Sequence, residues 1–209
     1  MIRVDFLVVG PLSTNCYFLI NEETKEAVII DPGADAHKII HCLSNKDIKP
    51  IAILLTHGHF DHMTAAELLR KTYEIPVYVC EKEKQLLQSA SLNLANMFFG
   101  AEISMDADVY CKEGDILSLA GCEIKVIETP GHTPGGCCYY IASEGRMFTG
   151  DTLFCRGIGR TDFPGGSYKE LCAGIKEKLF TLPQETICYT GHGESTTIGY
   201  EKERNPYVR

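Results

Sequence analysis

The segment Thr56–His62 carries an unusually dense set of side chains that bind metal ions. It contains His57, His59, Asp61 and His62, which together read H-x-H-x-D-H. Residues two apart in an extended chain point to the same side, so His57 and His59 can reach one ion together. Asp61 and His62 follow at the start of the next expected helix and can face a second ion. Imidazole and carboxylate are normal ligands of zinc, iron and manganese, so the segment predicts a transition-metal site.

Three further candidate ligands stand at the ends of apolar, strand-like runs. They are His132, Asp151 and His192, and each directly follows a glycine. Glycine and proline in these short segments favour tight loops that aim a side chain. We therefore predict that the three complete two metal coordination spheres. His37 and His41 are also four residues apart on an expected helix, but no third ligand is adjacent, so we expect a solvated face there.

The hydrophobic pattern predicts one domain, residues 1–209, of two β layers with helices outside. Strands are expected at 2–9, 15–20, 27–31, 51–55, 76–80, 116–119, 122–128, 137–142, 146–149 and 186–189. Helices are expected at 35–44, 63–73 and 167–179, with a charged helix starting within 81–89. Residues 90–110 have the weakest pattern, with a helix suggested near 92–98. Each candidate ligand falls where a strand ends and a loop begins, which is where α/β folds place function.

Composition narrows the class of protein. The net charge of −8 and the lack of a basic patch argue against nucleic acid as a partner. No targeting segment or run of about 20 apolar residues is visible, so we expect a cytoplasmic protein that does not enter a membrane. The ten cysteines contain no C-x-x-C pair. Most lie in apolar runs, so we expect them to be reduced and buried.

The motifs, in their order along the chain, resemble the metallo-β-lactamase superfamily. The matching segments are Thr56–His62, Glu128–His132, Gly150-Asp151 and Gly191-His192. Two further segments, Gly157–Gly166 and Thr196–Glu201, are similar to a short, single-domain bacterial subgroup of glyoxalase II-like hydrolases. The resemblance implies an α/β fold of four layers, αββα, and a site for two divalent metal ions. Zinc is the first expectation for these ions, with iron or manganese as alternatives.

The resemblance also implies roles for individual residues. The first metal would be held by His57, His59 and His132, the second by Asp61, His62 and His192, with Asp151 bridging both. The implied reaction is hydrolysis of a small thioester of the hydroxyacylglutathione kind, or of a related ester, by activated water. We interpret Asp61 as a catalytic residue that also orients or deprotonates the water. Arg160 is a candidate clamp for an anionic substrate, with a salt bridge to Asp162 as the alternative.

Departures from the family pattern keep other functions open. The chain continues only 17 residues beyond His192 (209 − 192), so the C-terminal helical domain of full-length glyoxalase II is not expected, which puts glutathione thioesters in doubt. Asp151 stands where some true β-lactamases have cysteine, which argues against antibiotic hydrolysis. The main alternative is a persulfide dioxygenase with one iron, which has a segment similar to Gly159–Phe163. A non-catalytic binding protein and a nuclease are the remaining alternatives.

Overall fold

Two six-stranded sheets form the centre of the computed structural model, which describes residues 1–208. The first sheet runs in the order β1 (Ile2–Val9), β2 (Thr14–Asn21), β3 (Glu26–Ile30), β4 (Lys49–Leu54), β5 (Val77–Cys80) and β6 (Val109–Cys111). The second runs β14 (Thr196–Thr197), β13 (Ile187–Thr190), β10 (Arg146–Gly150), β9 (Cys137–Ile141), β8 (Cys122–Glu128) and β7 (Ile116–Leu119). A separate hairpin pairs β11 (Leu153–Phe154) with β12 (Gly157–Ile158).

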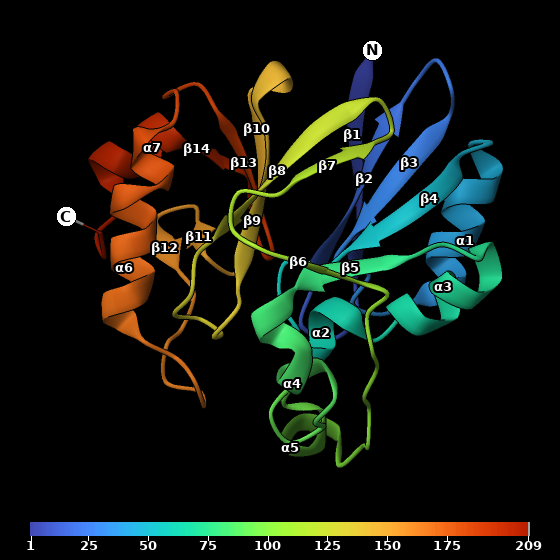
Figure 1. Ribbon diagram of the computed structural model, residues 1–209, viewed down its shortest axis with the longest axis horizontal. Helices are drawn as coiled ribbons and strands as arrows, with labels where there is room; N and C mark the ends of the chain where they lie inside the picture. Colours follow the sequence, from blue (N-terminus) through green and yellow to red (C-terminus); the bar gives the residue numbers. More distant parts are fainter. Residues whose placement is uncertain (209) are drawn as a thin grey trace.

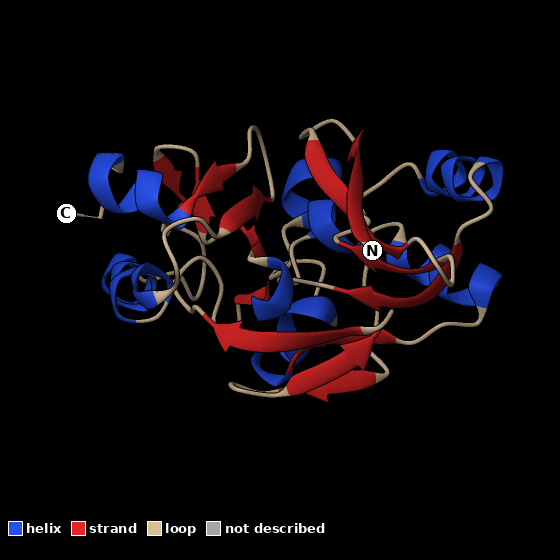
Figure 2. Cartoon of the chain, turned by 90° about the horizontal axis from the view of Figure 1, so that it is seen from above, coloured by secondary structure: helices blue, strands red, loops and turns tan. Residues whose placement is uncertain are grey.

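Helices cover the outer face of each sheet (Figure 1, Figure 2). On the first sheet lie α1 (Ala36–Asn45) and α3 (Ala66–Tyr73), and on the second lie α6 (Tyr168–Glu177) and α7 (Ile198–Arg204). The short helices α2 (Phe60–Met63), α4 (Lys84–Leu87) and α5 (Ala95–Phe99) lie together at one end, at the bottom of Figure 1. The four layers confirm the predicted αββα sandwich.

The strands place their side chains alternately on the two faces of each sheet, and these side chains help to form three apolar clusters. In β2, Tyr17 and Leu19 face the second sheet, whereas Phe18 and Ile20 face α1 and α3. Successive residues of a strand point to opposite faces, so a strand that is apolar throughout is buried on both sides. The space between the sheets is filled by residues of both, including Leu54, Tyr139 and Phe148. A separate cluster, which includes Leu171, Ile175 and Ile198, packs α6 and α7 against the second sheet.

The expected helix at 63–73 is broken in the structure. A short helix, α2, ends at Met63, and α3 begins at Ala66. The amide of Ala65 donates to the carbonyl of Pro32 at 2.9 Å rather than to the carbonyl of Asp61. The carbonyl of Asp61 instead packs against Gly33, where a Cβ atom would lie only 1.5 Å from it. A contact with the loop after β3 therefore separates the turn that carries Asp61 from the helix that follows.

Several short elements have no counterpart in the sequence prediction. They are β6, β14, the β11–β12 hairpin and α7. Helix α7 did have a local signal, because Thr197 accepts a hydrogen bond from the amide of Tyr200 and so caps its first turn. All ten cysteines are free and most are buried, as expected. Within residues 1–208, no helix has both the length and the apolar character needed to cross a membrane.

A glycine allows the loop before His132 to cross the start of α6. Gly131 has a φ of +130°, and a Cβ there would lie 2.5 Å from the backbone nitrogen of Leu171 and the carbonyl oxygen of Ser167. The amide of Ser167 donates to the carbonyl of Gly131 at 2.8 Å. The loop that presents His132 is thus anchored on the first turn of a helix.

We expect Gly131→Ala to lower the free energy of unfolding by about 3 kcal/mol, because the added methyl group overlaps backbone atoms. Gly145→Ala is the matched control, since Gly145 also has a positive φ (+59°) but no atom lies within 4 Å of the point that a Cβ would occupy. That variant should lose only about 1 kcal/mol. Urea unfolding of both variants measures the difference, and equal losses would contradict the steric explanation.

Candidate metal centre

Four strand ends converge on one site between the two sheets. The strands are β4, β8, β10 and β13, and each leads directly into a loop that carries candidate ligands. The structure brings all seven predicted metal-ligand residues together there, in three overlapping groups whose ligand atoms lie within 4.8 Å of one another. The groups are His57, His59 and His132; His57, His62 and Asp151; and Asp61, His62 and His192.

The first group consists of three buried histidines. Nδ1 of His59 lies 3.0 Å from Nε2 of His132. The ring centroid of His57 lies 4.8 Å from that of His59 and 4.9 Å from that of His132. One nitrogen of each ring lies within 4.8 Å of a nitrogen of the other two, so the three nitrogens are close enough together to bind one metal ion.

The group of Asp61, His62 and His192, called the second group from here on, combines one carboxylate with two histidines. Oδ2 of Asp61 lies 3.3 Å from Nε2 of His192 and 3.6 Å from Nε2 of His62. The two histidine nitrogens are themselves 3.3 Å apart. His192 is the most open member, with 27% of its side chain exposed. This group therefore lies nearer to solvent than the three histidines of the first.

Asp151 lies between the two groups. Its Oδ2 is 3.5 Å from Nε2 of His132 in the first group and 3.6 Å from Nε2 of His192 in the second. Its Oδ1 is 3.3 Å from Nε2 of His62. Among the described residues, Asp151 is thus the carboxylate that lies within 3.6 Å of a histidine nitrogen of each group.

Two buried polar atoms at the centre, Nε2 of His57 and Oδ1 of Asp151, have no hydrogen bond of normal geometry, although Oδ1 lies 3.3 Å from Nε2 of His62. Leaving such atoms unpaired costs about 1–3 kcal/mol each, so native proteins rarely do so without a reason. Both atoms belong to the three groups above. The donor set of imidazole nitrogens and carboxylate oxygens, with two atoms left unpaired, fits divalent transition-metal ions.

The histidines of the centre differ in the direction in which their pKa values are shifted. Burial lowers the pKa of His57 well below its usual value and lowers that of His59 to about 3. Burial also opposes protonation of His62, but the carboxylates of Asp61 and Asp151 outweigh it and raise the pKa. The pKa of His192 is raised as well: burial opposes this, but the hydrogen bond with Asp61 outweighs it. Without a metal ion, His57 and His59 are therefore neutral, whereas His62 and His192 are paired with carboxylates.

In His62, His132 and His192, a contact at Nδ1 determines that Nε2 faces the centre. Nδ1 of His62 lies 3.0 Å from Oδ2 of Asp31, and Nδ1 of His132 lies 2.7 Å from the carbonyl oxygen of Arg160. Nδ1 of His192 lies 3.1 Å from the carbonyl oxygen of Leu12. A ring that donates from Nδ1 to such an acceptor leaves its Nε2 free to bind a metal, which is the usual arrangement around protein metal sites.

Asp31 is a residue of the site that our reading of the sequence missed. It is buried and accepts hydrogen bonds from the amide of Thr56 at 2.8 Å and from its hydroxyl at 2.7 Å. It therefore orients both His62 and the start of the histidine-rich loop. A signal was available, because Asp31 ends an apolar strand in the same way that Asp151 does.

Glu83 is a second missed residue, and it joins two of the ligand loops. Its carboxylate accepts the amide of Gly58 at 2.7 Å, between His57 and His59, and the amide of Gly135 at 2.6 Å, in the loop after His132. The side chain is fully buried, and burial raises its pKa. In the sequence it lies in the charged run Glu81–Lys84, which reads as solvent-exposed.

We expect Glu83→Ala to lower the free energy of unfolding by about 2–4 kcal/mol, because two buried amides lose their acceptor. The amount of metal bound at a limiting metal concentration should fall too, since the loops of the first histidine group lose their connection. Glu81→Ala is the matched control, because the Glu81 side chain is 58% exposed. A Glu83→Ala protein that matched the control in unfolding and metal content would refute this role.

The remaining candidates lie around the centre rather than in it. The guanidinium of Arg160 makes a two-point contact with Asp162, at 2.8 and 2.7 Å, and stacks on Phe163, 3.9 Å from the ring centroid. Phe163 in turn meets the ring of His59 edge-on at 5.8 Å. Arg160 therefore lies near the first histidine group. It forms the salt bridge with Asp162 that the sequence analysis gave as the alternative to a substrate clamp. Cys155, expected to be buried, is exposed in the β11–β12 turn.

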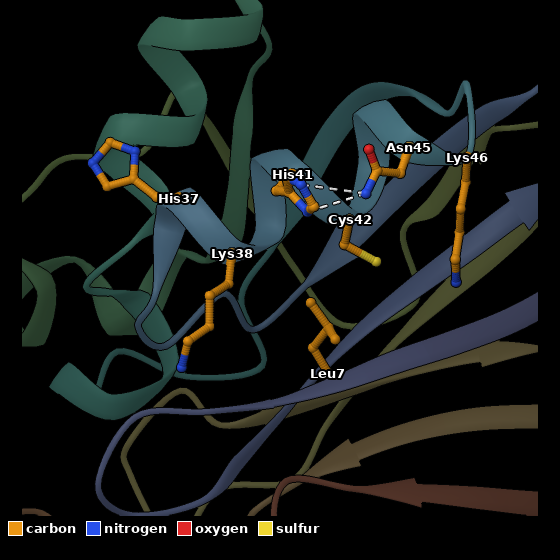
Figure 3. Close-up of a pocket in the computed structure, with 7 residues that line it drawn as sticks. All are labelled: Leu7, His37, Lys38, His41, Cys42, Asn45 and Lys46. Carbon is orange, nitrogen blue, oxygen red and sulfur yellow. Dashed lines mark hydrogen bonds between the residues drawn. The ribbon is translucent and has the colours of Figure 1, made fainter.

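His37 and His41 lie on α1 and line a surface groove outside the centre (Figure 3). Their side chains point in different directions, and Asn45 contacts only His41, 3.1 Å from its Nδ1. Neither histidine belongs to a three-ligand group among the described residues.

The family model of the metallo-beta-lactamase superfamily matches residues 9–192. The chain therefore belongs to this superfamily, as its motifs predicted. It is 41% identical over 201 residues to a protein named "Probable metallo-hydrolase YqgX" from Bacillus subtilis, covering 96% of this chain and 94% of that one. It is 37% identical over 211 residues to "Hydroxyacylglutathione hydrolase GloC" from Haemophilus influenzae, covering 99% and 98%.

Solved structures share the fold closely. The B3 metallo-beta-lactamase BLEG-1 is 42% identical, with a TM-score of 0.94 and 99% of each chain covered. TTHA1623 in a di-iron-bound form is 34% identical, with a TM-score of 0.85 and coverage of 97% of this chain and 99% of that one. ETHE1 from Myxococcus xanthus is 31% identical, with a TM-score of 0.82 and coverage of 100% and 84%. The chain is therefore a member of this superfamily that is related to metallo-hydrolases. Its cluster of histidine and aspartate side chains is suited to divalent metal ions.

Proposed function

We propose that the chain is a metal-dependent thioesterase with two divalent metal ions. His57, His59 and His132 would hold one ion, Asp61, His62 and His192 the other, and Asp151 both. The observation that carries this proposal is the position of Asp151, whose Oδ2 lies within 3.6 Å of a histidine nitrogen of each group. Its other oxygen, Oδ1, is buried and lies 3.3 Å from Nε2 of His62 without a hydrogen bond of normal geometry. Zinc, iron and manganese all suit such ligands, and a relative contains two irons.

The chemistry divides between the ions and the protein. Bound divalent ions acidify water and polarise a carbonyl, which makes hydrolysis possible at neutral pH. Asp61 is the carboxylate placed to orient the attacking water and accept its proton, because it lies at the more open group. Burial opposes its ionisation, but His62 and His192 hold its pKa below the usual value. Attack on the carbonyl carbon breaks the carbon–sulfur bond and releases an acid and a thiol.

A small thioester is the substrate class that this reading favours. The relative named GloC is a hydroxyacylglutathione hydrolase and covers 99% of this chain. Arg160 supplies a positive charge near the first histidine group, suited to an anionic thiol portion, although Asp162 already neutralises part of it.

Two other reactions have specific support. The likeness to ETHE1 keeps the persulfide dioxygenase alternative, which needs one iron, while the set of seven ligands favours two ions. The likeness to BLEG-1 requires that β-lactam hydrolysis also be measured. Each alternative predicts a different metal content or substrate.

We expect the purified protein to bind two metal ions per chain and to hydrolyse thioesters, S-lactoylglutathione among them. Chelation should abolish the activity and added metal should restore it. His59→Ala should lose at least about 100-fold in kcat/KM, whereas His41→Ala, on the surface of α1, should not. Metal analysis, thioester and β-lactam hydrolysis, and oxygen uptake with glutathione persulfide decide the outcome. One iron per chain with oxygen uptake, or hydrolysis of β-lactams alone, would overturn the proposal.

The two metal ions should differ in their response to pH. The raised pKa values of His62 and His192 favour their protonated forms as the pH falls, and an ion must displace these protons. His57 and His59 have lowered pKa values and have no such protons to lose. Lowering the pH from 8 to 6 should therefore weaken binding of the second ion more, by about tenfold per pH unit for each proton displaced.

Calorimetric metal titrations in buffers of different ionisation enthalpy measure these protons directly. His192→Ala is the control, because it should retain the first histidine group and bind one ion with little release of protons. Two ions that weaken in parallel as the pH falls would contradict the assignment of charge.

A further inference from the structure

A small cavity adjoins the proposed catalytic carboxylate on the side of the β1–β2 turn. Its volume is about 120 Å³, and it lies between that turn, the loop after β3 and helix α2. The side chains that define it include Val9, Leu12, Ala34, Phe60, Asp61 and Ile103. Apart from Asp61, all of these are apolar, so the cavity offers a solvent-poor space directly beside an ionised group.

The hydroxyl groups that also line the cavity are already engaged within the protein. Oγ1 of Thr14 donates to Oδ2 of Asp61 at 3.2 Å. Oγ1 of Thr64 donates to the carbonyl oxygen of Phe60. Neither hydroxyl has a hydrogen left to donate, so a hydrogen-bond acceptor that entered would lose contacts with water and find no donor among these hydroxyl groups. The cavity is therefore suited to hydrocarbon.

Asp61 connects this cavity to the metal centre. The same Oδ2 atom that accepts from Thr14 lies 3.3 Å from Nε2 of His192. One face of the carboxylate thus belongs to the second ligand group, while the residue also forms part of the cavity wall. A carbonyl carbon attacked beside Asp61 would have the cavity within reach of its alkyl substituent.

We propose that this cavity is the acyl subsite and that the substrate carries a short, unbranched, apolar acyl chain. The inference rests on the proposed thioesterase function and gives it a substrate class. A dry apolar cavity of about 150 Å³ can hold benzene, which has six non-hydrogen atoms, so a cavity of 120 Å³ holds about five. Butyryl and pentanoyl chains, with three and four carbons beyond the carbonyl, match this size. An octanoyl chain, with seven carbons beyond the carbonyl, exceeds this size, and the hydroxyl of a lactoyl group would enter a space lined mainly by apolar side chains.

A series of thioesters of one thiol, N-acetylcysteamine, tests the subsite in the metal-loaded protein. Burial of each methylene favours binding by about fourfold, so kcat/KM should rise about 15-fold from acetyl to butyryl. It should fall again at octanoyl, and lactoyl should be a poorer substrate than butyryl. An acyl profile that is flat, or that is highest at octanoyl or lactoyl, would overturn the subsite.

Ala34→Leu fills the cavity, whereas Ala142→Leu adds the same group at an exposed turn after β9. The ratio of butyryl to acetyl kcat/KM should fall to about one in Ala34→Leu and stay near 15 in Ala142→Leu. Thermal unfolding of both variants shows whether they are folded. An unchanged ratio in folded Ala34→Leu would also refute the subsite.

Xenon provides a measurement that does not depend on activity. Crystals of the wild-type protein under xenon should bind the gas in this cavity, as dry apolar cavities do, and crystals of Ala34→Leu should not. Absence of xenon from the wild-type cavity would overturn its apolar character. If no thioester of the series is hydrolysed by the protein with two ions bound, the proposed function itself fails. If acetyl and octanoyl thioesters are hydrolysed as well as butyryl, only the acyl subsite fails.

Discussion

The structure depends on burying acidic and histidine side chains together where the strands of two sheets end. A carboxylate that leaves water without compensation is costly, and three of them, Asp31, Asp61 and Asp151, surround His62. Their charges outweigh the effect of burial and raise the pKa of that histidine. Ion pairing thus helps to hold the second ligand group in place. A cation that replaced the proton on His62 would meet the same three negative charges.

Close packing of loops is the second requirement of this arrangement. Gly33 lies against the carbonyl of Asp61, and Gly191 lies against the carboxylate of Asp151, where a Cβ would be 2.2 Å from Oδ1. Any larger side chain at these positions would push a carboxylate out of line with its histidines. The glycines before Asp151 and His192 therefore reflect crowding around the centre, whereas Gly131 is required by its contact with the start of α6. Glu83 completes the packing by tying two loops from different sheets to one buried carboxylate.

The sequence predicted the elements and ligands whose signal is local. Strands that are apolar on both faces, such as β2 and β4, could be recognised from their continuous hydrophobic runs. The seven candidate ligands could be recognised because each follows such a run, and the structure brings them together. Glu83 could not be found in this way, since its burial results from a contact between two loops distant in sequence. The break between α2 and α3 depends likewise on Pro32 and Gly33, which lie outside the helical pattern that predicted one helix.

The centre alone does not set the reaction. Proteins named as a hydroxyacylglutathione hydrolase and as a B3 metallo-beta-lactamase are 37% and 42% identical to this chain along almost its entire length. Differences in activity within one fold must then come from the walls of the site. In this chain the walls are the β1–β2 turn, the segment around Ile103 and the loop that carries Arg160 and Phe163. Asp61 and the first two of these line one cavity and Arg160 belongs to the third, so the acyl and thiol portions of a substrate would be recognised by different loops. Selectivity for one portion can therefore change while the ligands of the centre stay the same.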